Sequence, residues 1–116
     1  MGMKQISGNE LRGHLETMLL SALERGDAHG FELMQRLTKQ GRGLLQLREG
    51  TLYPVLYRLE GAGLIKGTWE DGSQRRRGPR RCVYSLTGDG RQELQARRET
   101  WRDFVSVIGE IVEAPA

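Results

Sequence analysis

Several residue types are scarce in this chain of 116 residues, and each scarcity excludes a class of protein. Cys82 is the only cysteine, so the chain cannot form an internal disulfide bond. The only histidines are His14 and His29, and with one thiol beside them they are too few for us to expect a structural zinc site. We therefore expect no bound metal.

Long apolar runs are also missing. No stretch approaches the roughly 20 apolar residues that a membrane-spanning helix needs. Residues 1–13 lack the apolar centre of a secretion signal. We expect a cytoplasmic protein that has no membrane partner.

The residue patterns of common active sites do not occur. No serine has a base and an orienting acid at a recognisable spacing. The acidic residues Glu10, Glu16 and Asp27 do not form a paired-carboxylate arrangement, and the glycines do not match a phosphate-binding loop. The sequence therefore predicts neither an enzyme nor a bound cofactor.

The composition is that of one globular domain with a small core. Hydrophobic residues make up 37% of the chain and charged residues 28%. The formal net charge is +3, an excess too small to identify a nucleic-acid partner by itself. Its distribution says more, because one acid-free stretch holds Arg75, Arg76, Arg77, Arg80 and Arg81. Such a cluster is either a solvated loop or a set of phosphate contacts.

Apolar periodicity predicts two helices in the first third of the chain. Ser7 to Glu10 fits a capping box, and the apolar spacing behind it predicts a helix from about Asn9 to Glu24. Asp27 can cap a second helix, which breaks before Gly41. The apolar residues of this second helix are Phe31, Leu33, Met34 and Leu37.

A third helix is predicted by Leu52, Leu56 and Leu59, which recur at i, i+4 and i+7 and form one apolar stripe. Its remaining positions carry hydroxyl, phenol and guanidinium groups, which suit phosphates and base edges. These residues are Thr51, Tyr53, Tyr57 and Arg58, and we expect Thr51 to lie beside the two tyrosines. A merely solvated helix face has little use for two such phenols.

The start of the third helix has two interpretations. Pro54 suits the first turn of a helix, whereas Leu52 already belongs to the apolar stripe. The helix therefore begins either near Pro54 or near Glu49, and the leucine spacing favours the earlier start. Gly61 and Gly63 then end it, because glycine tolerates the left-handed backbone of a helix C-terminus.

Two extended segments follow the third helix. Leu64 to Glu70 and Arg80 to Leu86 contain strand-forming residues, and residues 71–79 between them are rich in arginine and turn formers. Together they predict a β-hairpin with a basic tip. The order of helix, helix, helix and hairpin predicts a mainly α, α+β fold, a winged helix-turn-helix over residues 9–86.

The last segment predicts a long helix from Gly88 to about Glu113, capped by Thr87. Its apolar residues fall on one seam, and the core of three helices and a wing has no groove left to cover them. We therefore expect a homodimer built on the helix 87–113, with flexible termini at 1–8 and 114–116. The expected dimer contacts are Leu94, Trp101, Phe104, Val105, Ile108, Ile111 and Val112.

Several short motifs stand at the joints between these elements. They are HGFEL at residues 29–33, GTLYP at 50–54 with Leu56, RLE at 58–60, GLI at 63–65, and YSLT at 84–87 with Gly90. Through these motifs the chain resembles the PadR family of bacterial transcriptional regulators over about residues 11–112. Its short C-terminus is similar to that of family members with a single C-terminal helix.

The resemblance implies a dimeric repressor that often controls a neighbouring efflux or detoxification operon. In some relatives a tryptophan on the last helix stacks flat aromatic drugs across the dimer. Trp101 falls at the matching place and has Val105 beside it, so these residues are candidates for a small planar ligand. The simpler interpretation of Trp101 is a dimer-core anchor, since large aromatic residues dominate interface energies.

The expected partner is double-stranded DNA. Helix-turn-helix proteins place their recognition helix in the major groove of DNA. We therefore expect the start of the third helix to enter the major groove and the wing to contact the flanking backbone. A two-fold dimer then needs a near-palindromic operator with half-site centres about 34 Å apart. The residues expected to contact DNA are His29, Gly30, Gly50, Thr51, Tyr53, Pro54, Tyr57, Arg58, Arg75, Arg76, Arg77 and Arg80. His29 and Gly30 are included because of the family resemblance.

Two other functions use the same elements. In one, the chain is a small-molecule-binding sensor that acts without specific DNA recognition, and the third helix is an ordinary core helix. In the other, the chain binds DNA without sequence preference. A sequence-specific footprint separates the expected regulator from both.

Overall fold

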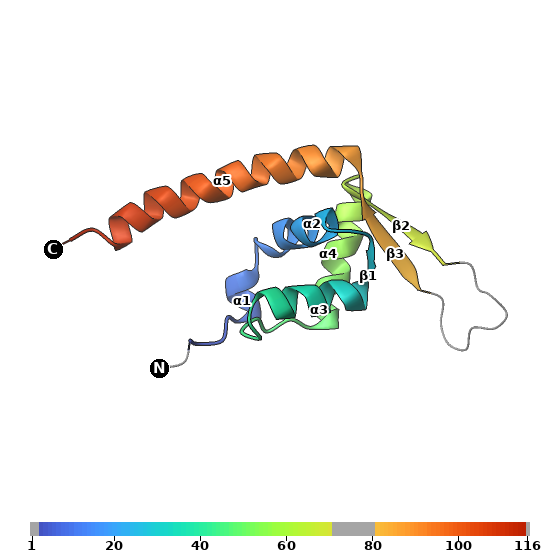
Figure 1. Ribbon diagram of the computed structural model, residues 1–116, viewed down its shortest axis with the longest axis horizontal. Helices are drawn as coiled ribbons and strands as arrows, with labels where there is room; N and C mark the ends of the chain where they lie inside the picture. The colour runs from blue at the N-terminus through green and yellow to red at the C-terminus, as the bar shows by residue number, and fades with distance from the viewer. Residues whose placement is uncertain (1–2, 71–80, 116) are drawn as a thin grey trace.

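The computed structural model describes residues 3–70 and 81–115. Its elements in chain order are α1 (Gly8–Leu11), α2 (Leu15–Glu24), β1 (Ala28–His29), α3 (Gly30–Gln40), α4 (Glu49–Gly61), β2 (Ile65–Trp69), β3 (Cys82–Leu86) and α5 (Gly88–Val112). Figure 1 shows α2, α3 and α4 packed together, the two longer strands projecting to one side, and α5 running over α2 and beyond it. The expected winged helix-turn-helix fold is confirmed.

The core is made mainly of leucine side chains. The helix α2 lies at its centre and contacts α3, α4, α5 and β3. The largest fully buried side chains come from every helix except α1, which joins the burial only through Leu11. They are Leu19, Leu20, Leu23, Leu33, Leu52, Leu56, Leu59, Ile65 and Leu94.

The prediction of one helix from Asn9 to Glu24 is wrong, because the segment divides into α1 and α2. The chain leaves the helical conformation at Arg12, whose ψ is 131°, and Gly13 follows with a φ of +90°. Glycine tolerates this left-handed backbone, and the helix is interrupted there. The apolar spacing of the sequence continues across the interruption and therefore gives no sign of it. At the start of α1 the amide of Glu10 donates to the Ser7 hydroxyl at 3.2 Å, as half of the expected capping box requires.

The start of the second predicted helix also needs correction. His29 caps α3, and Asp27 lies outside the helix. Ala28 and His29 instead form β1, in which Ala28 pairs with Tyr84 and His29 with Val83. A two-residue strand is too short to show a periodicity in the sequence.

The start of α4 at Glu49 confirms the earlier of the two expected starts. Pro54 lies inside the helix and cannot donate to the carbonyl of Gly50 four residues before it. The helix ends in a Schellman motif, with the amide of Leu64 donating to the Leu59 carbonyl at 3.0 Å. Gly63 adopts a φ of +75° there, as expected.

The sheet has the strand order β1-β3-β2, and both pairs are antiparallel. The hairpin pairs Ile65 with Leu86 at its base and Trp69 with Cys82 near its tip. The expected strands are thereby confirmed. The expected basic tip, with Arg75, Arg76, Arg77 and Arg80, lies in residues 71–80, outside the described part of the chain.

The helix α5 begins at the base of the hairpin. Thr87 caps it as expected, accepting from the Gly90 amide at 3.0 Å and donating to the Gly63 carbonyl at 2.7 Å. Gly90 is needed here, because a β-carbon on it would lie 1.9 Å from the Leu64 carbonyl oxygen. These contacts fix the direction in which α5 leaves the hairpin.

The first half of α5 packs on the rest of the chain, whereas the second half is mostly exposed. Leu94 is fully buried, and Arg98 pairs with Glu24 of α2 at 2.9 Å. Leu94 therefore belongs to the core of its own chain, and its expected place in a dimer seam is corrected. The other predicted seam residues are all between 42% and 73% exposed, as is Val107, which the sequence analysis missed.

Candidate nucleic-acid interface

The helix α4 presents an exposed edge with two different flanks. Its buried side consists of Leu52, Val55, Leu56 and Leu59. On the opposite side lie Gly50, Pro54 and Tyr57, all exposed. A helix advances 100° per residue, so Thr51 and Arg58 lie on one flank of this edge and Tyr53 lies on the other.

The two flanks line separate hollows. Thr51 and Arg58 line one hollow, and Tyr53 and Tyr57 line the other. The expectation that Thr51 lies beside both tyrosines is therefore wrong. The apolar stripe correctly predicted the buried leucines of α4. It did not predict the order of the exposed residues around the helix.

The hollow lined by Tyr53 and Tyr57, which we call the aromatic hollow, has a volume of about 370 Å³. It lies between α3, α4 and the hairpin. Three large rings around it are unusually open: Phe31 is 55% exposed, Tyr57 61% and Trp69 58%. Phe31 and Trp69 were not among the predicted site residues. The full lining is His29, Gly30, Phe31, Glu32, Tyr53, Tyr57, Trp69, Arg81, Cys82 and Tyr84.

Tyr53 is held closely against the start of α3. A β-carbon on Gly30 would lie 2.6 Å from the Tyr53 hydroxyl, so only glycine leaves room for this ring. Gly30 is itself buried, and its part in the site is to seat Tyr53. Burial, followed by the nearby Glu49 carboxylate, raises the pKa of the Tyr53 phenol. The hydroxyl consequently keeps its proton and can donate a hydrogen bond.

His29 is held between two carboxylates. Its backbone amide donates to Glu32 at 3.0 Å, its Nδ1 atom contacts the same carboxylate, and its Nε2 atom lies 2.8 Å from Glu70. The hydrogen bond from the His29 amide is the main cause that lowers the pKa of Glu32. Both ring nitrogens of His29 face protein groups, so the residue joins α3 to the end of β2.

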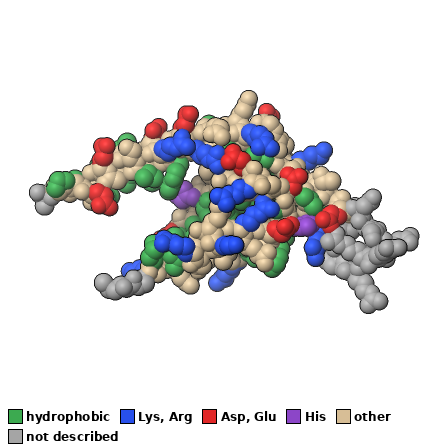
Figure 2. Space-filling view, viewed as in Figure 1, with side chains coloured by type: hydrophobic (Ala, Val, Ile, Leu, Met, Phe, Trp, Pro, Cys, Tyr) green, Lys and Arg blue, Asp and Glu red, His purple; other side chains and the backbone are tan. Residues whose placement is uncertain are grey.

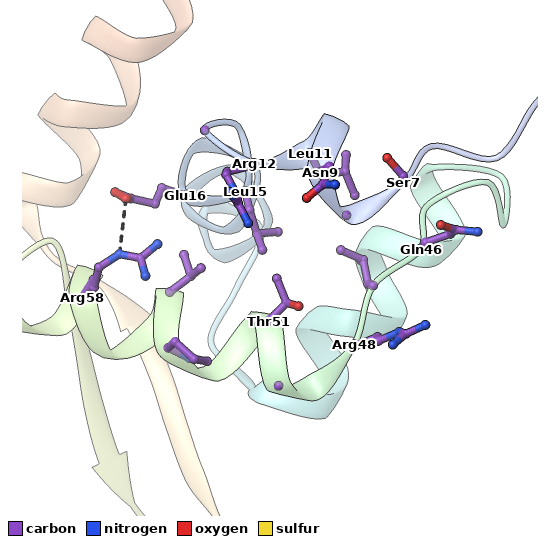
Figure 3. Close-up of a pocket in the computed structure, with 16 residues that line it drawn as sticks. Ser7, Asn9, Leu11, Arg12, Leu15, Glu16, Gln46, Arg48, Thr51 and Arg58 are labelled. Carbon is purple, nitrogen blue, oxygen red and sulfur yellow. Dashed lines mark ion pairs between the residues drawn. The ribbon is translucent and has the colours of Figure 1, made fainter.

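The hollow lined by Thr51 and Arg58, which we call the arginine hollow, has a volume of about 620 Å³. It lies between α1, the start of α2, and α4. Figure 3 shows Asn9, Leu11 and Arg12 on one side of it and Thr51 on the opposite side. Arg58 points toward Glu16, but the pair is weak, with Nε and Oε2 3.9 Å apart and the Arg58 side chain 61% exposed. Of the residues expected to contact DNA, Gly50, Thr51, Pro54 and Arg58 line this hollow.

The second half of α5, residues 101–112, which we call the free half, carries the predicted ligand-binding residues and the remaining predicted dimer residues. Figure 2 shows apolar side chains along its lower edge and acidic ones along its upper edge. Trp101 is 49% exposed and stacks on Phe104 with ring centroids 6.0 Å apart and an interplanar angle of 17°. The ring centroids of His14 and Trp101 lie 5.4 Å apart, with an interplanar angle of 72°. Val105, the other residue expected near a ligand, is 48% exposed.

Other kinds of site find no support in the described residues. No group of three or more His, Cys, Asp or Glu side chains among residues 3–70 and 81–115 is placed to hold a metal ion. In the same part of the chain, none of the helices is both long and apolar enough to cross a membrane.

A helix-turn-helix followed by a β-hairpin and a long terminal helix defines the winged-helix class of transcriptional regulators. Residues 19–96 match the PadR-like family of transcriptional regulators, and the chain belongs to that family. The resemblance drawn from the sequence motifs is confirmed.

Individual relatives agree with this assignment. The chain is 30% identical to the transcriptional regulator YqjI of Escherichia coli over 102 residues, which span 88% of this chain and 44% of YqjI. A transcriptional regulator structure from Clostridium thermocellum superposes with a TM-score of 0.81 at 31% identity, covering 92% of this chain and 98% of that one. A PadR-like regulator structure from Bacillus cereus gives 0.76 at 28% identity, covering 93% and 100%.

Proposed function

We propose that this PadR-family regulator binds a near-palindromic operator in double-stranded DNA as a homodimer and represses transcription in the cytoplasm. The observation that carries the proposal is the exposed edge of α4, where Gly50, Pro54 and Tyr57 stand clear of the core. Gly50 and Pro54 lack long side chains, so the start of the helix is slim enough to approach base edges closely. Tyr57 then supplies a ring and a hydroxyl for contact with the bases.

The flanks of α4 support this docking. The hairpin stands next to the aromatic hollow, with Arg81 exposed at its lining. With α4 in the major groove, the hairpin lies along the flanking backbone, where Arg75, Arg76, Arg77 and Arg80 of its tip are proposed to contact phosphates. In this arrangement His29 and Gly30 act indirectly, because they hold the hairpin and Tyr53 in place.

The free half of α5 supports the homodimer. Trp101, Val105 and Ile108 are 42% to 49% exposed on one side of this half of α5, although Trp101 also contacts His14. Contiguous apolar surface of this kind normally marks an interface. A second copy packed antiparallel along the same seam would cover both helices and relate the two α4 helices by a two-fold axis.

The direct test is a binding-site selection on random duplex DNA with the full chain. The proposal predicts a recovered near-palindrome whose half-site centres lie about 34 Å apart, or a multiple of that distance. Recovery of unrelated sequences despite tight binding would support a non-specific DNA binder instead. No binding at any salt concentration would favour a sensor that works without DNA.

We further propose that a small planar ligand relieves repression by binding at Trp101. The Trp101 ring is half-exposed and already stacks in parallel on Phe104, and across a two-fold axis it would face its own copy. Titration of a flat cationic dye should quench the Trp101 fluorescence and weaken operator binding. The experiment is best done with Trp69→Phe, so that one fluorophore remains, and an equal dye affinity in Trp101→Ala would exclude this site.

A further inference from the structure

The arginine hollow has a positive charge that the described residues do not balance. Three guanidinium groups line it, those of Arg12, Arg48 and Arg58, against the single carboxylate of Glu16. Glu16 is already paired with Arg97 of α5, whose Nη1 lies 3.3 Å from its Oε1. Within the described part of the chain, neither Arg12 nor Arg48 is paired with a carboxylate.

The wall of the hollow opposite α4 is fixed in place. The segment before α1 pairs with the turn between α3 and α4: the Ile6 amide donates to the Leu44 carbonyl at 2.7 Å, and the Gln46 amide donates to the Ile6 carbonyl at 3.0 Å. Part of the segment expected to be a flexible terminus is thus hydrogen-bonded to the body. Ser7, Asn9 and Gln46 line the hollow from this side, and the side-chain amide of Gln46 donates to Gln5 at 2.7 Å (Figure 3).

The position of the hollow relative to α4 indicates what it faces. The major groove is about 12 Å wide, and a helix with its side chains is about 10–12 Å across. A helix inserted in the groove therefore has one sugar-phosphate strand on each side. If the edge formed by Gly50, Pro54 and Tyr57 enters the groove, one strand passes the aromatic hollow and hairpin, and the other passes the arginine hollow.

We infer that the arginine hollow is a second phosphate-backbone site, in which Arg12 and Arg48 contact the DNA strand on the side of α4 opposite the hairpin. The inference rests on the proposed DNA binding and extends it to the flank of α4 opposite the hairpin, where Arg48 is the N-cap of α4 and Arg12 follows α1. The guanidinium groups supply charge and fork-shaped donors for phosphate oxygens. The side-chain amide of Asn9 supplies a neutral donor of the kind that commonly contacts phosphates.

The test compares single charge removals. Arg12→Gln and Arg48→Gln each remove one positive charge at an exposed position, and Arg48 makes no side-chain cap to α4 that the change would break. The matched control is Arg102→Gln, on the free half of α5 away from the hollow. Circular dichroism of all three variants confirms that they fold like the wild type.

The readout is the salt dependence of binding to the selected operator and to a scrambled duplex. Loss of one phosphate contact should reduce the slope of log K against log salt by about 0.9. Arg12→Gln and Arg48→Gln should show this reduced slope and should weaken binding to both duplexes by the same factor. Arg102→Gln should bind both duplexes like the wild type. Because phosphate contacts carry no sequence information, the ratio of the two affinities should stay constant.

The outcomes separate this inference from the proposed function. Wild-type slopes in both hollow variants, with specific binding intact, would overturn the second backbone site and leave the repressor proposal standing. A change in the affinity ratio would also overturn it, because the arginines would then contact bases. If the wild type itself shows no sequence-specific binding, the proposed function fails and the inference fails with it.

Discussion

The Nε2 atom of His29 lies 2.8 Å from the Oε1 atom of Glu70, and this contact joins the first residue before α3 to the residue that follows β2. The amide of Glu70 also donates to the Arg81 carbonyl at 2.8 Å, so the contact acts where the hairpin opens toward its tip. The helix-turn-helix and the wing are therefore connected by side chains as well as by the main chain of β1 and β3.

This connection predicts energetic coupling between the two residues. His29→Ala and Glu70→Ala should each lower the free energy of unfolding, and the double variant should lose less than the sum of the single losses. The coupling energy should be about 1 kcal/mol, the size of a part-exposed hydrogen bond. Urea denaturation of the four proteins measures it. Additive losses would show that the observed contact contributes nothing to stability.

Acid should weaken the joint between α2 and α5. The hydrogen bonds from Arg98 are the main cause that lowers the pKa of Glu24 in the folded chain. A carboxyl whose folded pKa lies below its unfolded value adds stability above the unfolded value, and this stability is lost as the pH falls through the folded value. The window therefore lies below the ordinary value of 4.5. Glu24→Gln should flatten the fall of the unfolding midpoint there, and an unchanged pH profile would refute the role of this pair.

Gly30→Ala should affect DNA binding through Tyr53. The new methyl group would overlap the Tyr53 ring, with 2.6 Å to its hydroxyl, and the ring must turn away. Steric changes of this kind cost about 1–3 kcal/mol. In a Tyr53→Ala background the same glycine change should cost little in stability and in operator affinity. Equal losses in both backgrounds would mean that Gly30 acts independently of the ring.

Two substitutions on α5 should have opposite consequences. Ile108→Asp places a charge on the exposed seam and should yield folded monomers in sedimentation experiments, because the core does not include Ile108. Leu94→Ala should instead lower the free energy of unfolding by about 2–5 kcal/mol, because Leu94 is fully buried within the chain. A dimer that survives Ile108→Asp would contradict the proposed interface.

The sequence predicted the architecture well where local chemistry decides it. The leucine stripe of α4, the glycine at its end and the threonine cap of α5 are local signals, and the structure has each of them at the expected residue. Gly13 produced the error in the first helix, because its left-handed backbone interrupts the chain without disturbing the apolar spacing. A glycine at that position was the available signal.

The candidate site depended more on contacts between distant residues. The pairing of His29 with Glu70 spans 41 positions, and no local pattern predicts it. Phe31 was expected on the apolar side of its helix, yet it is 55% exposed at the aromatic hollow, because it lies about 200° around α3 from the fully buried Leu33. The arginine hollow likewise forms only when residues 7–16 fold against α4. Such surfaces require the tertiary structure.

The central claim, that the exposed edge of α4 recognises the operator, is tested most directly by the affinity ratio between the selected operator and a scrambled duplex for Tyr57→Ala. One lost base contact costs about 1–3 kcal/mol, so the ratio should fall by about 5- to 150-fold while the salt slope stays at its wild-type value. Tyr57→Phe serves as the control that keeps the ring. An unchanged ratio in Tyr57→Ala would contradict the account.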